Sequence, residues 1–394
     1  MRRGEYNGAS SGDRGLSGPA TVAGALAGYD MSAQQHLAKR LGISQATISR
    51  VLNHPEMVRP ETRARVVEAM RELNYERNEL PQRLRAGGLD MVGICISGIQ
   101  NEFFVSMIHG IDLAVSERDW ATVLRFTHDH LESERRIVGE MRALRFGGLI
   151  LLPQEENREL YASLESKRFP FVFIDHTVEG VDAPRVATDE KLGGRLSAEH
   201  VLDLGHRRIG RIYGPQEVQS FAERTAGALQ AIAERGIPMD PRWSVPAFQM
   251  TAEQRARRRS REPLRIVAKE IRQVTRHRVA EGRAAMARLL DLPEGLRPTA
   301  VLCENDLLAT GAQREAMARG LDVPGEVSIV GYAGFSLTEF LPVPLTTVRQ
   351  PAHEIGVAAV EALFGLRAGD AGARENRLLP PELKVRASTG PVPD

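Results

Sequence analysis

Small hydroxyl and amide side chains, with one arginine among them, are concentrated in the stretch GISQATISRVLN, Gly42–Asn53. Its apolar residues Ile48, Val51 and Leu52 recur at the spacing of one helix face, which leaves the polar side chains on the opposite face. Side chains presented in this way can bond to base edges and phosphates in the major groove of DNA, and Arg50 can form two bonds to a guanine. An ordinary pair of surface helices would show the same pattern, so the residues alone leave both interpretations open.

The segments around this stretch predict a helix-turn-helix. The run LAKRLG predicts a helix that ends at Gly42, and the hydroxyl of Ser44 can cap a second helix by accepting from free N–H groups of its first turn. A third helix is predicted in ETRARVVEAMRELNY, where Pro60 suits the first turn. We therefore predict an all-α domain over residues 32–76 and a basic connector over residues 77–89. The side chains that point outward, or toward the start of the second helix, are those of Gln45, Ala46, Thr47, Ser49, Arg50 and Asn53.

From Met91 onward, apolar strand runs alternate with amphipathic helices. This alternation predicts parallel sheets with helices on both faces, in two series that cross near residues 212–214. Two series give an α/β core of two lobes over residues 90–394, with ligand bound between the lobes at the carboxyl ends of the strands. The strands are predicted at residues 91–97, 121–126, 147–153, 171–175, 208–214, 299–305 and 327–333. The helices between them include residues 105–119 and 193–205.

Length and composition fit a multidomain protein of the cell interior. A chain of 394 residues is too long for one small core. Its 52 basic and 51 acidic residues give a net charge of +1, which by itself says nothing about a polyanionic partner. The two cysteines, Cys95 and Cys303, lie in apolar runs and are expected to be core thiols in a reducing cytoplasm. No apolar run approaches the roughly 20 residues that span a bilayer. Residues 1–31 are expected to be a disordered tail, with Met31 an alternative start.

The sequence lacks the short motifs that carry several common enzyme chemistries. It contains no Gly-x-Ser-x-Gly elbow, no His-Glu-x-x-His and no Gly-x-x-x-x-Gly-Lys loop. The run THDH places His128 and His130 around Asp129, but it falls in a predicted loop and has no partner cluster for a metal. We predict neither enzymatic activity nor a metal or other cofactor.

Several of these motifs, in this order, resemble the LacI/GalR family of transcription regulators. GISQATISRVLN, TRARVVEAMRELNY and the connector ending in QRLRAG are similar to the family's headpiece and hinge. The resemblance continues through VGICISGIQNEFFVSMIHGID, GGLILLP, FVFID, EHVLDLGHRRI, PTAVLCENDLLATGA, GLDVPGEVSIVGY and PLTTVRQP. It implies a sequence-specific DNA-binding regulator, expected to be a repressor, in the cytoplasm and associated with the nucleoid. The alternative is a solute-binding protein that carries an N-terminal extension and does not read DNA sequence.

The resemblance implies particular roles in DNA binding. Gln45 and Ala46 occupy the paired specificity positions and Arg50 that of the base-contacting arginine. Leu84 matches the leucine that the family's hinge wedges into the minor groove at the operator centre, although it can also simply cover the core domain. Headpieces and hinges act in pairs, so a homodimer on a pseudo-palindromic operator is expected. The family's tail for tetramers is missing from the end KVRASTGPVPD. The positions expected mainly to face phosphates are Ser44, Thr47, Ser49 and Asn53.

The same resemblance implies a core like the sugar-binding periplasmic proteins, in which a ligand in the cleft changes the affinity for the operator. Aromatic faces opposite charged and amide groups suit a polyhydroxylated ligand, a sugar or sugar derivative. Asn305 can instead serve only as a cap of the following helix. The residues carried over to this site are Phe103, Phe104, Asp175, Arg224, Asn305 and Gln350.

Some positions depart from the family pattern. Ala333 and Gly334 stand where the family usually has an aspartate that holds a ligand hydroxyl, which puts a simple hexose in doubt. Gln34 replaces an apolar residue of the first helix, and Arg59 replaces the usual serine or threonine before the third. Pro81 lies in the hinge helix, where it is tolerable only in the first turn.

One insertion, RARRRSREPLRIVAKEIRQVTRHR at residues 255–278, interrupts the resemblance. Its many basic side chains face only Glu262 and Glu270. Such a run can bind nucleic acid or an acidic partner, or it can be a solvated surface helix without a partner. We do not include it in operator binding.

Overall fold

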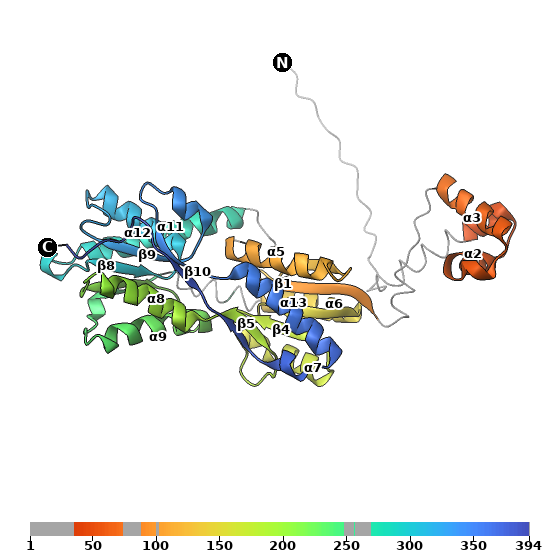
Figure 1. Ribbon diagram of the computed structural model, residues 1–394, viewed down its shortest axis with the longest axis horizontal. Helices are drawn as coiled ribbons and strands as arrows, with labels where there is room; N and C mark the ends of the chain where they lie inside the picture. The colour runs from red at the N-terminus through yellow and green to blue at the C-terminus, as the bar shows by residue number, and fades with distance from the viewer. Residues whose placement is uncertain (1–34, 74–87, 100–101, 248–255, 257–268, 394) are drawn as a thin grey trace, which may run out of the picture. The chain divides into compact units, whose positions relative to one another are not determined.

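The computed structural model divides into two units, Met1–Leu89 and Asp90–Asp394 (Figure 1). The residues that it describes are 35–73, 88–99, 102–247, 256 and 269–393. The predicted tail therefore lies outside the described residues, as do Pro81, Leu84 and most of the basic insertion.

The N-terminal unit consists of short helices, as the sequence predicts. A helix over residues 35–41 is followed by Gly42, whose φ of +65° is a left-handed conformation that glycine adopts without strain. Ser44 Oγ then accepts a hydrogen bond from the N–H of Thr47 at 3.1 Å, which caps the next helix. Pro60 occupies the first turn of the last helix, as expected. The elements are α2 (Gln45–Asn53), η1 (Pro55–Met57) and α3 (Pro60–Glu72).

The core of this unit is small. Leu37, Ile48 and Val66 are fully buried and come one from each of the three α-helices. An ion pair of 2.6 Å between Arg40 and Glu72 also joins the first helix to the last, but both side chains are half exposed, so it adds little stability. The unit therefore depends on a few buried residues and on its helix caps.

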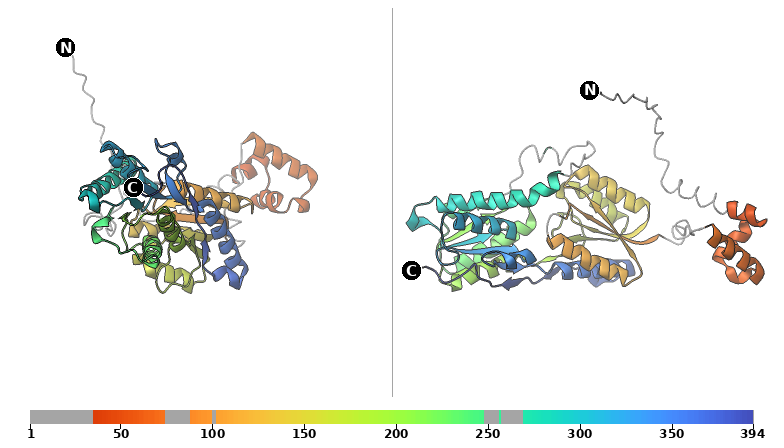
Figure 2. Two further views of the ribbon diagram at one scale, coloured as in Figure 1. Left: turned by 60° about the vertical axis from the view of Figure 1, so that its left-hand side comes forward. Right: turned by 90° about the horizontal axis from the view of Figure 1, so that it is seen from above.

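The first lobe of the core is built on a six-stranded sheet in the order β11-β5-β4-β3-β1-β2. Its described registers are all parallel. Helices α5 and α13 pack together on one face of the sheet, and α6 lies on the other (Figure 2). The strands are β1 (Leu89–Ile96), β2 (Ala121–Phe126), β3 (Phe146–Leu151), β4 (Phe171–Ile174), β5 (Arg185–Thr188) and β11 (Arg377–Leu379). The helices are α5 (Glu102–Ser116), α6 (Leu131–Ala143), α7 (Arg158–Ser166) and α13 (Ala352–Ala368), with η2 (Glu155–Asn157) and η6 (Ala371–Arg374).

The second lobe has a six-stranded sheet in the order β12-β10-β9-β8-β6-β7. Its pairs are parallel except at the edge, where β12 runs antiparallel to β10. The core of α8 and α9 covers one face, and that of α11 and α12 the other. The strands are β6 (Ile209–Tyr213), β7 (Ser244–Pro246), β8 (Ala300–Cys303), β9 (Ser328–Ala333), β10 (Thr346–Arg349) and β12 (Glu382–Lys384). The helices are α8 (Glu190–Asp203), α9 (Gln219–Glu234), α11 (Lys269–Leu290) and α12 (Asp306–Ala318), with η3 (Pro241–Trp243), η4 (Glu294–Leu296) and η5 (Ser336–Phe340).

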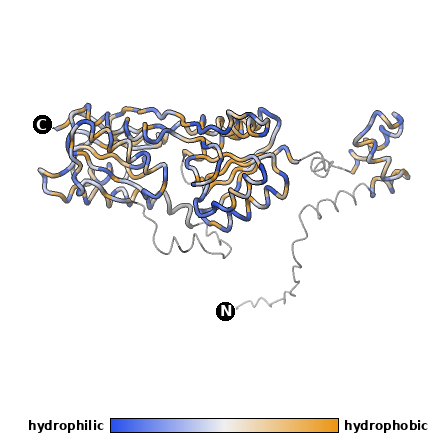
Figure 3. Tube along the Cα trace, turned by 90° about the horizontal axis from the view of Figure 1, so that it is seen from below, coloured by the Kyte–Doolittle hydropathy of each residue, from blue (hydrophilic) through white to orange (hydrophobic). Residues whose placement is uncertain are grey.

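The prediction of two lobes with parallel sheets is confirmed, and all seven predicted strands are present. The apolar strands form the interior of each lobe (Figure 3). The predicted crossing near residues 212–214 is wrong, because β6 already belongs to the second sheet. The chain crosses instead from β5 to α8, returns from β10 to α13, and crosses again from β11 to β12. These crossings involve short strands without a long apolar run, which the sequence pattern did not reveal.

Helices α8 and α9 approach each other closely because two glycines lie in their interface. A Cβ atom on Gly227 would lie 1.9 Å from the carbonyl oxygen of Lys191, and one on Gly194 would lie 1.9 Å from that of Arg224. Only glycine fits such contacts without displacement of backbone. The close approach brings the start of α9 against the crossing between the lobes.

Both cysteines are buried core thiols, as predicted, and burial raises the pKa of each. Within the described residues, no three or more histidines, cysteines or acids form a cluster that could hold a metal ion. Among the helices that the structure describes, none is long and apolar enough to cross a membrane.

Candidate functional site

The outer face of α2 presents the polar residues that the sequence singled out. Ala46 and Arg50 are exposed, and Gln45, Thr47 and Ser49 are half-buried. The structure thus places these five residues on one short helix, with Ile48 and Val51 turned into the core. The side chain of Asn53 is not among the described ones, and Leu84 lies outside the described residues.

The charge pattern of α2 favours an anionic partner. Its first turn contains no acidic residue, so the partial positive charge of the free N–H groups is not neutralised by a side chain of that turn. Ser44 Oγ lies 2.9 Å from Thr47 Oγ1, and each hydroxyl retains capacity for a further bond. Arg50 adds a full positive charge in the last turn. The helix can therefore bind phosphates near its start and acceptor groups along its outer face.

In the core unit, three of the residues carried over from the resemblance follow the ends of strands, namely Asp175, Asn305 and Gln350. Asp175 follows β4 and has a φ of 70°, an uncommon conformation for a residue with a side chain. Its Oδ2 lies 3.1 Å from Nδ1 of His176, and it accepts a hydrogen bond of 3.2 Å from Ser220 Oγ, at the start of α9 in the other lobe. Burial opposes the ionisation of Asp175, but the hydrogen bond and charge of His176 outweigh it, and the pKa of Asp175 is lowered. An ionised acceptor therefore stands where the two lobes meet.

Arg224 lies at the centre of a buried charge cluster. Its guanidinium pairs with Glu190, the first residue of α8, and with Glu304, which follows β8, both at 2.8 Å. The guanidinium also lies 3.6 Å from the centre of the Tyr332 ring. One arginine thus connects the crossing between the lobes with the ends of two strands in the second sheet.

One guanidinium charge cannot neutralise two buried carboxylates fully. Burial raises the pKa of Glu190 to about 7, although Arg224 opposes the rise. Burial also raises the pKa of Glu304. Arg224 itself stays charged, because the two carboxylates outweigh the effect of burial on its pKa. Because the groups are coupled, we expect the cluster to take up a proton near neutral pH.

Gln350 closes the cluster from the second crossing. Its Nε2 donates to Oγ1 of Thr188 at 3.1 Å and to Glu190 at 2.8 Å. The side chain is buried and joins the β10–α13 crossing to the β5–α8 crossing. Gln350 therefore lies at the crossings between the two lobes, and it shares its partner Glu190 with Arg224.

Three predicted residues lie less centrally. Phe103 and Phe104 are half-buried at the start of α5, with ring centres 5.3 Å apart in an edge-to-face arrangement. Asn305 Oδ1 accepts from the N–H of Leu308 at 3.0 Å, so the capping role that the sequence left open is present. This bond uses one of the two lone pairs of the carbonyl oxygen, and no hydrogen bond among the described residues uses the amide nitrogen, so both groups can still contact a ligand.

The departure at Ala333 has a structural consequence. Ala333 has a φ of 117°, which strains a residue with a Cβ atom. The neighbouring carboxylate is that of buried Asp306, which accepts hydrogen bonds from Phe335 N–H at 2.7 Å and Thr347 Oγ1 at 2.6 Å. Burial raises the pKa of Asp306 to about 7. Asp306 thus holds the loop after β9 but is fully buried, so it does not replace the missing ligand contact.

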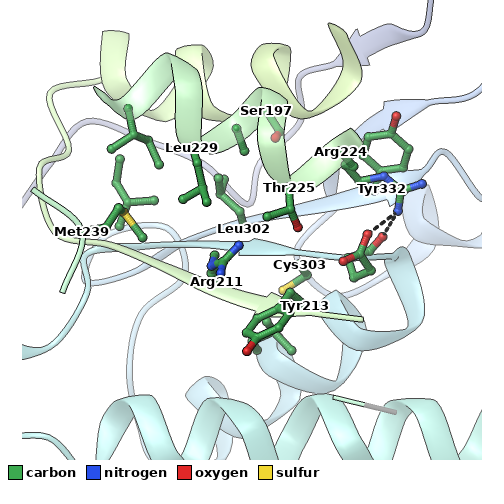
Figure 4. A pocket seen from close by; sticks show the side chains of 15 residues that line it. Ser197, Arg211, Tyr213, Arg224, Thr225, Leu229, Met239, Leu302, Cys303 and Tyr332 are labelled. Atoms are coloured by element: carbon green, nitrogen blue, oxygen red, sulfur yellow. Dashed lines mark hydrogen bonds and ion pairs between the residues drawn. The ribbon is translucent and has the colours of Figure 1, made fainter. Parts of the chain in front are cut away.

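A pocket lies in the second lobe between α9 and the sheet (Figure 4). Of the residues carried over from the resemblance, Arg224 is the one that lines it. The predicted site at the strand ends and this pocket therefore share one side chain.

The site predicted from the sequence did not include Glu190, Glu304 and Ser220. Each bonds to a residue that it singled out, but across 34 to 80 positions in the chain. Glu304 stands beside Asn305 directly after an apolar run, and this position was the available signal for it. No local pattern marks Glu190 or Ser220.

Comparison with known protein families covers both units. Residues 35–78 match the family described as bacterial regulatory proteins, lacI family. Residues 90–258 match the periplasmic binding proteins and sugar binding domain of the LacI family, and residues 198–389 match a periplasmic binding protein-like domain.

Known relatives match over nearly the whole length. An HTH-type transcriptional regulator in the aml 5′ region of Streptomyces limosus is 33% identical over 359 residues, 90% of this chain and 93% of that protein. The crystal structure of the lac repressor dimer bound to operator and the anti-inducer ONPF has a TM-score of 0.72 at 26% identity, covering 90% of this chain and 98% of that one. A transcriptional regulator CelR–cellobiose complex has a TM-score of 0.62 at 25% identity, covering 90% and 99%. These relatives are transcriptional regulators, in agreement with the prediction that the chain is not an enzyme.

Proposed function

This chain belongs to the LacI family of bacterial regulatory proteins, and from that premise we propose that it represses transcription as a homodimer on a pseudo-palindromic operator, under the control of a carbohydrate-related ligand. Family membership makes it a DNA-binding transcriptional regulator. One observation supports the finer proposal. The chain combines a polar outer helix face with a two-lobed core that has a buried charge cluster at the crossings between its lobes. A solute-binding protein that does not bind DNA does not require the polar helix face.

DNA reading is proposed for α2. Gln45, Ala46 and Arg50 contact base edges, and Arg50 discriminates a guanine through two bonds. Thr47 and Ser44 contact phosphates with their hydroxyls, and because Ser44 caps the helix and its hydroxyl bonds to that of Thr47, the bonds that start α2 also orient its phosphate contacts. Ser49 and Asn53 complete the phosphate contacts, and Leu84 of the hinge the minor-groove wedge.

The DNA contact is tested by fluorescence anisotropy on a selected operator duplex and its scrambled counterpart, with Arg50→Ala and the matched control Arg71→Ala. Arg71 is exposed in the last turn of α3 and pairs only loosely with Glu68, at 3.8 Å. We expect Arg50→Ala to lose about 10–100-fold in discrimination between the duplexes. Arg71→Ala should retain the discrimination. Equal losses in both variants would show that Arg50 acts only through its charge.

The homodimer is supported by exposed apolar side chains in the core unit. Leu337 and Phe340 of η5 are 76% and 80% exposed, and Val105 and Leu113 of α5 are 52% and 45% exposed. The N–H of Ser336 donates to Glu102 at 2.9 Å, which brings η5 next to the start of α5. A cluster of large exposed apolar residues from two neighbouring elements is typical of a protein interface. A two-fold dimer covers such a patch with a copy of itself.

Light scattering of the purified protein tests the dimer. We expect the wild type to be a dimer and Phe340→Glu to be a monomer with reduced operator affinity. Met317→Glu, which places the same charge on an exposed apolar position of α12, is the control and should remain dimeric. A wild-type monomer, or equal dissociation in both variants, would contradict the proposed interface.

The proposed effector site lies at the strand ends around Arg224 and Asp175. Asp175 is an ionised acceptor for a hydroxyl, and Arg224 and Gln350 are donors held beside it by the hinge. Phe103 and Phe104 offer apolar faces for the CH groups of a sugar ring. The amide nitrogen of Asn305 donates to the ligand. Because Gln350 and Glu190 belong to the two crossings, a ligand that reorganises them changes the relation of the lobes.

Ligand titration in thermal denaturation tests this site with a panel of mono- and disaccharides that includes cellobiose, the ligand in the CelR complex. We expect at least one sugar to raise the Tm of the wild type and to change its affinity for the operator. Asp175→Asn should weaken that sugar about tenfold or more, since it removes a charged acceptor. Glu159→Gln, an exposed carboxylate of α7, is the matched control. Equal sugar binding by Asp175→Asn and the control would refute the site.

A further inference from the structure

An arginine occupies a core-facing position in the second lobe. Ile209, Arg211 and Tyr213 alternate along β6, so their side chains point to the same face of the sheet, and Ile209 packs there in the core beneath α8 and α9. Arg211 thus points to the face of the sheet on which this apolar core lies. A charged residue in such a place needs partners or a function.

The partners of Arg211 within the protein are incomplete. Its Nε donates to Ser244 Oγ at 2.9 Å, and its guanidinium lies 4.4 Å from the centre of the Tyr213 ring. Its Nη1 is buried and has no hydrogen-bond partner among the described residues. Burial lowers the pKa of Arg211 against the opposing effects of Tyr213 and Glu304. By contrast, Arg224 holds two carboxylates at 2.8 Å.

The unpaired guanidinium lies in the pocket between α9 and the sheet. Figure 4 shows Arg211 on the sheet side of the pocket, with Leu229 above it on α9 and Met239 beside it. Leu302 adds a further apolar wall, and Thr225 supplies a hydroxyl. The pocket therefore combines a largely apolar wall with one buried donor, Arg211 Nη1, that has no partner in the part of the chain that the structure describes.

We infer that this pocket binds a small carboxylate with a short apolar body, of the size of acetate or propionate, whose anionic group is held by Arg211 and whose body lies against Leu229, Met239 and Leu302. Arg224 is already paired with Glu190 and Glu304, whereas Arg211, the other cation of the lining, has a buried Nη1 without a hydrogen-bond partner among the described residues.

A monoanion fits this balance better than a dianion, because Glu304 also lines the pocket and would repel a second negative charge. The site is separate from the proposed effector site, with Arg224 as the side chain common to both.

Isothermal titration calorimetry of the full-length protein tests the inference, with acetate and propionate as probes, propionamide as the neutral isostere and inorganic sulfate as the dianion. We expect both carboxylates to bind the wild type at millimolar concentration, and propionamide and sulfate to bind at least about tenfold more weakly, a loss of about 1.4 kcal/mol. Arg211→Leu should abolish carboxylate binding. Arg235→Leu, which removes an exposed arginine at the end of α9, should leave it unchanged.

Two further measurements separate loss of the site from loss of the fold. Arg211→Leu should have a higher Tm than the wild type without ligand, because leucine suits the apolar surroundings better than an unpaired guanidinium. Leu229→Trp fills the pocket while it keeps Arg211, and should also abolish binding. The inference is overturned if neither carboxylate binds the wild type, if Arg211→Leu binds them as well as the wild type does, or if propionamide or sulfate binds as tightly.

Discussion

The buried cluster of Arg224, Glu190 and Glu304 makes a specific prediction about stability and pH. Because burial disfavours the ionised form of Glu190 more than Arg224 favours it, Glu190 binds a proton near neutral pH in the folded protein and only near its ordinary pKa in the unfolded chain. A folded-state pKa above the unfolded one means that protonation of Glu190 stabilises the fold fully at low pH. That contribution is lost as the pH rises through about 7.

The magnitude follows from the rise in pKa. A change from 4.5 to about 7 corresponds to about 3 kcal/mol, at about 1.4 kcal/mol for each tenfold change in proton affinity. Glu190→Gln mimics the protonated side chain at every pH. The free energy of unfolding of Glu190→Gln relative to the wild type should therefore rise between pH 5 and pH 8.5, by up to about 3 kcal/mol.

Urea unfolding followed by tryptophan fluorescence measures this difference. Trp120 and Trp243 are the only tryptophans of the sequence, so the signal comes from the two lobes of the core. Taking the difference between variant and wild type cancels the titration of groups that both share. Glu159→Gln is the control and should show no comparable rise, because Glu159 is exposed. If the difference in free energy of unfolding between Glu190→Gln and the wild type stays flat or falls over this range, Glu190 is not protonated near neutral pH in the folded protein.

Three further substitutions probe local features of the fold. Gly227→Ala should destabilise the core by several kcal/mol, because the added Cβ would lie 1.9 Å from backbone. Gly139→Ala, in open space on α6, should instead stabilise the core by about 0.5–1 kcal/mol. Urea unfolding that ranks the two variants in the opposite order would contradict the close approach of α8 and α9. Arg59→Ser should stabilise the N-terminal unit by about 1 kcal/mol, because Arg59 gives α3 no side-chain cap, and hydrogen exchange of α3 amides should slow accordingly. Gln350→Leu should lower the free energy of unfolding by about 1–3 kcal/mol, because Thr188 and Glu190 lose a buried donor. An unchanged urea midpoint would show that the crossings between the lobes are not stabilised by these two hydrogen bonds.

The features predicted from sequence are those set by local spacing. The cap at Ser44, the turn at Gly42 and the core position of Ile48 follow from neighbouring residues, and the structure confirms each. The long strands follow from apolar runs in the same way.

What the sequence did not reveal depends on contacts between distant segments. β5 contains Arg185, and a charged residue does not predict a buried strand. In the structure Arg185 is paired with Glu223 of α9 at 2.8 Å, which permits its burial. The pairing of Arg224 with Glu190 and Glu304 likewise requires the crossings between the lobes, which were predicted at the wrong place. For Asn305, the capping bond within its own helix could be predicted from neighbouring residues, whereas its contact with a ligand remains a prediction.

Selection of bound duplexes from a random DNA library by the purified full-length protein, at moderate salt, tests directly whether a homodimer reads an operator. We expect enrichment of one two-fold symmetric site, and loss of that enrichment with Arg50→Ala but not with Arg71→Ala. Binding without any enriched sequence, or enrichment of a motif without two-fold symmetry, would contradict the proposed reading of an operator by a homodimer.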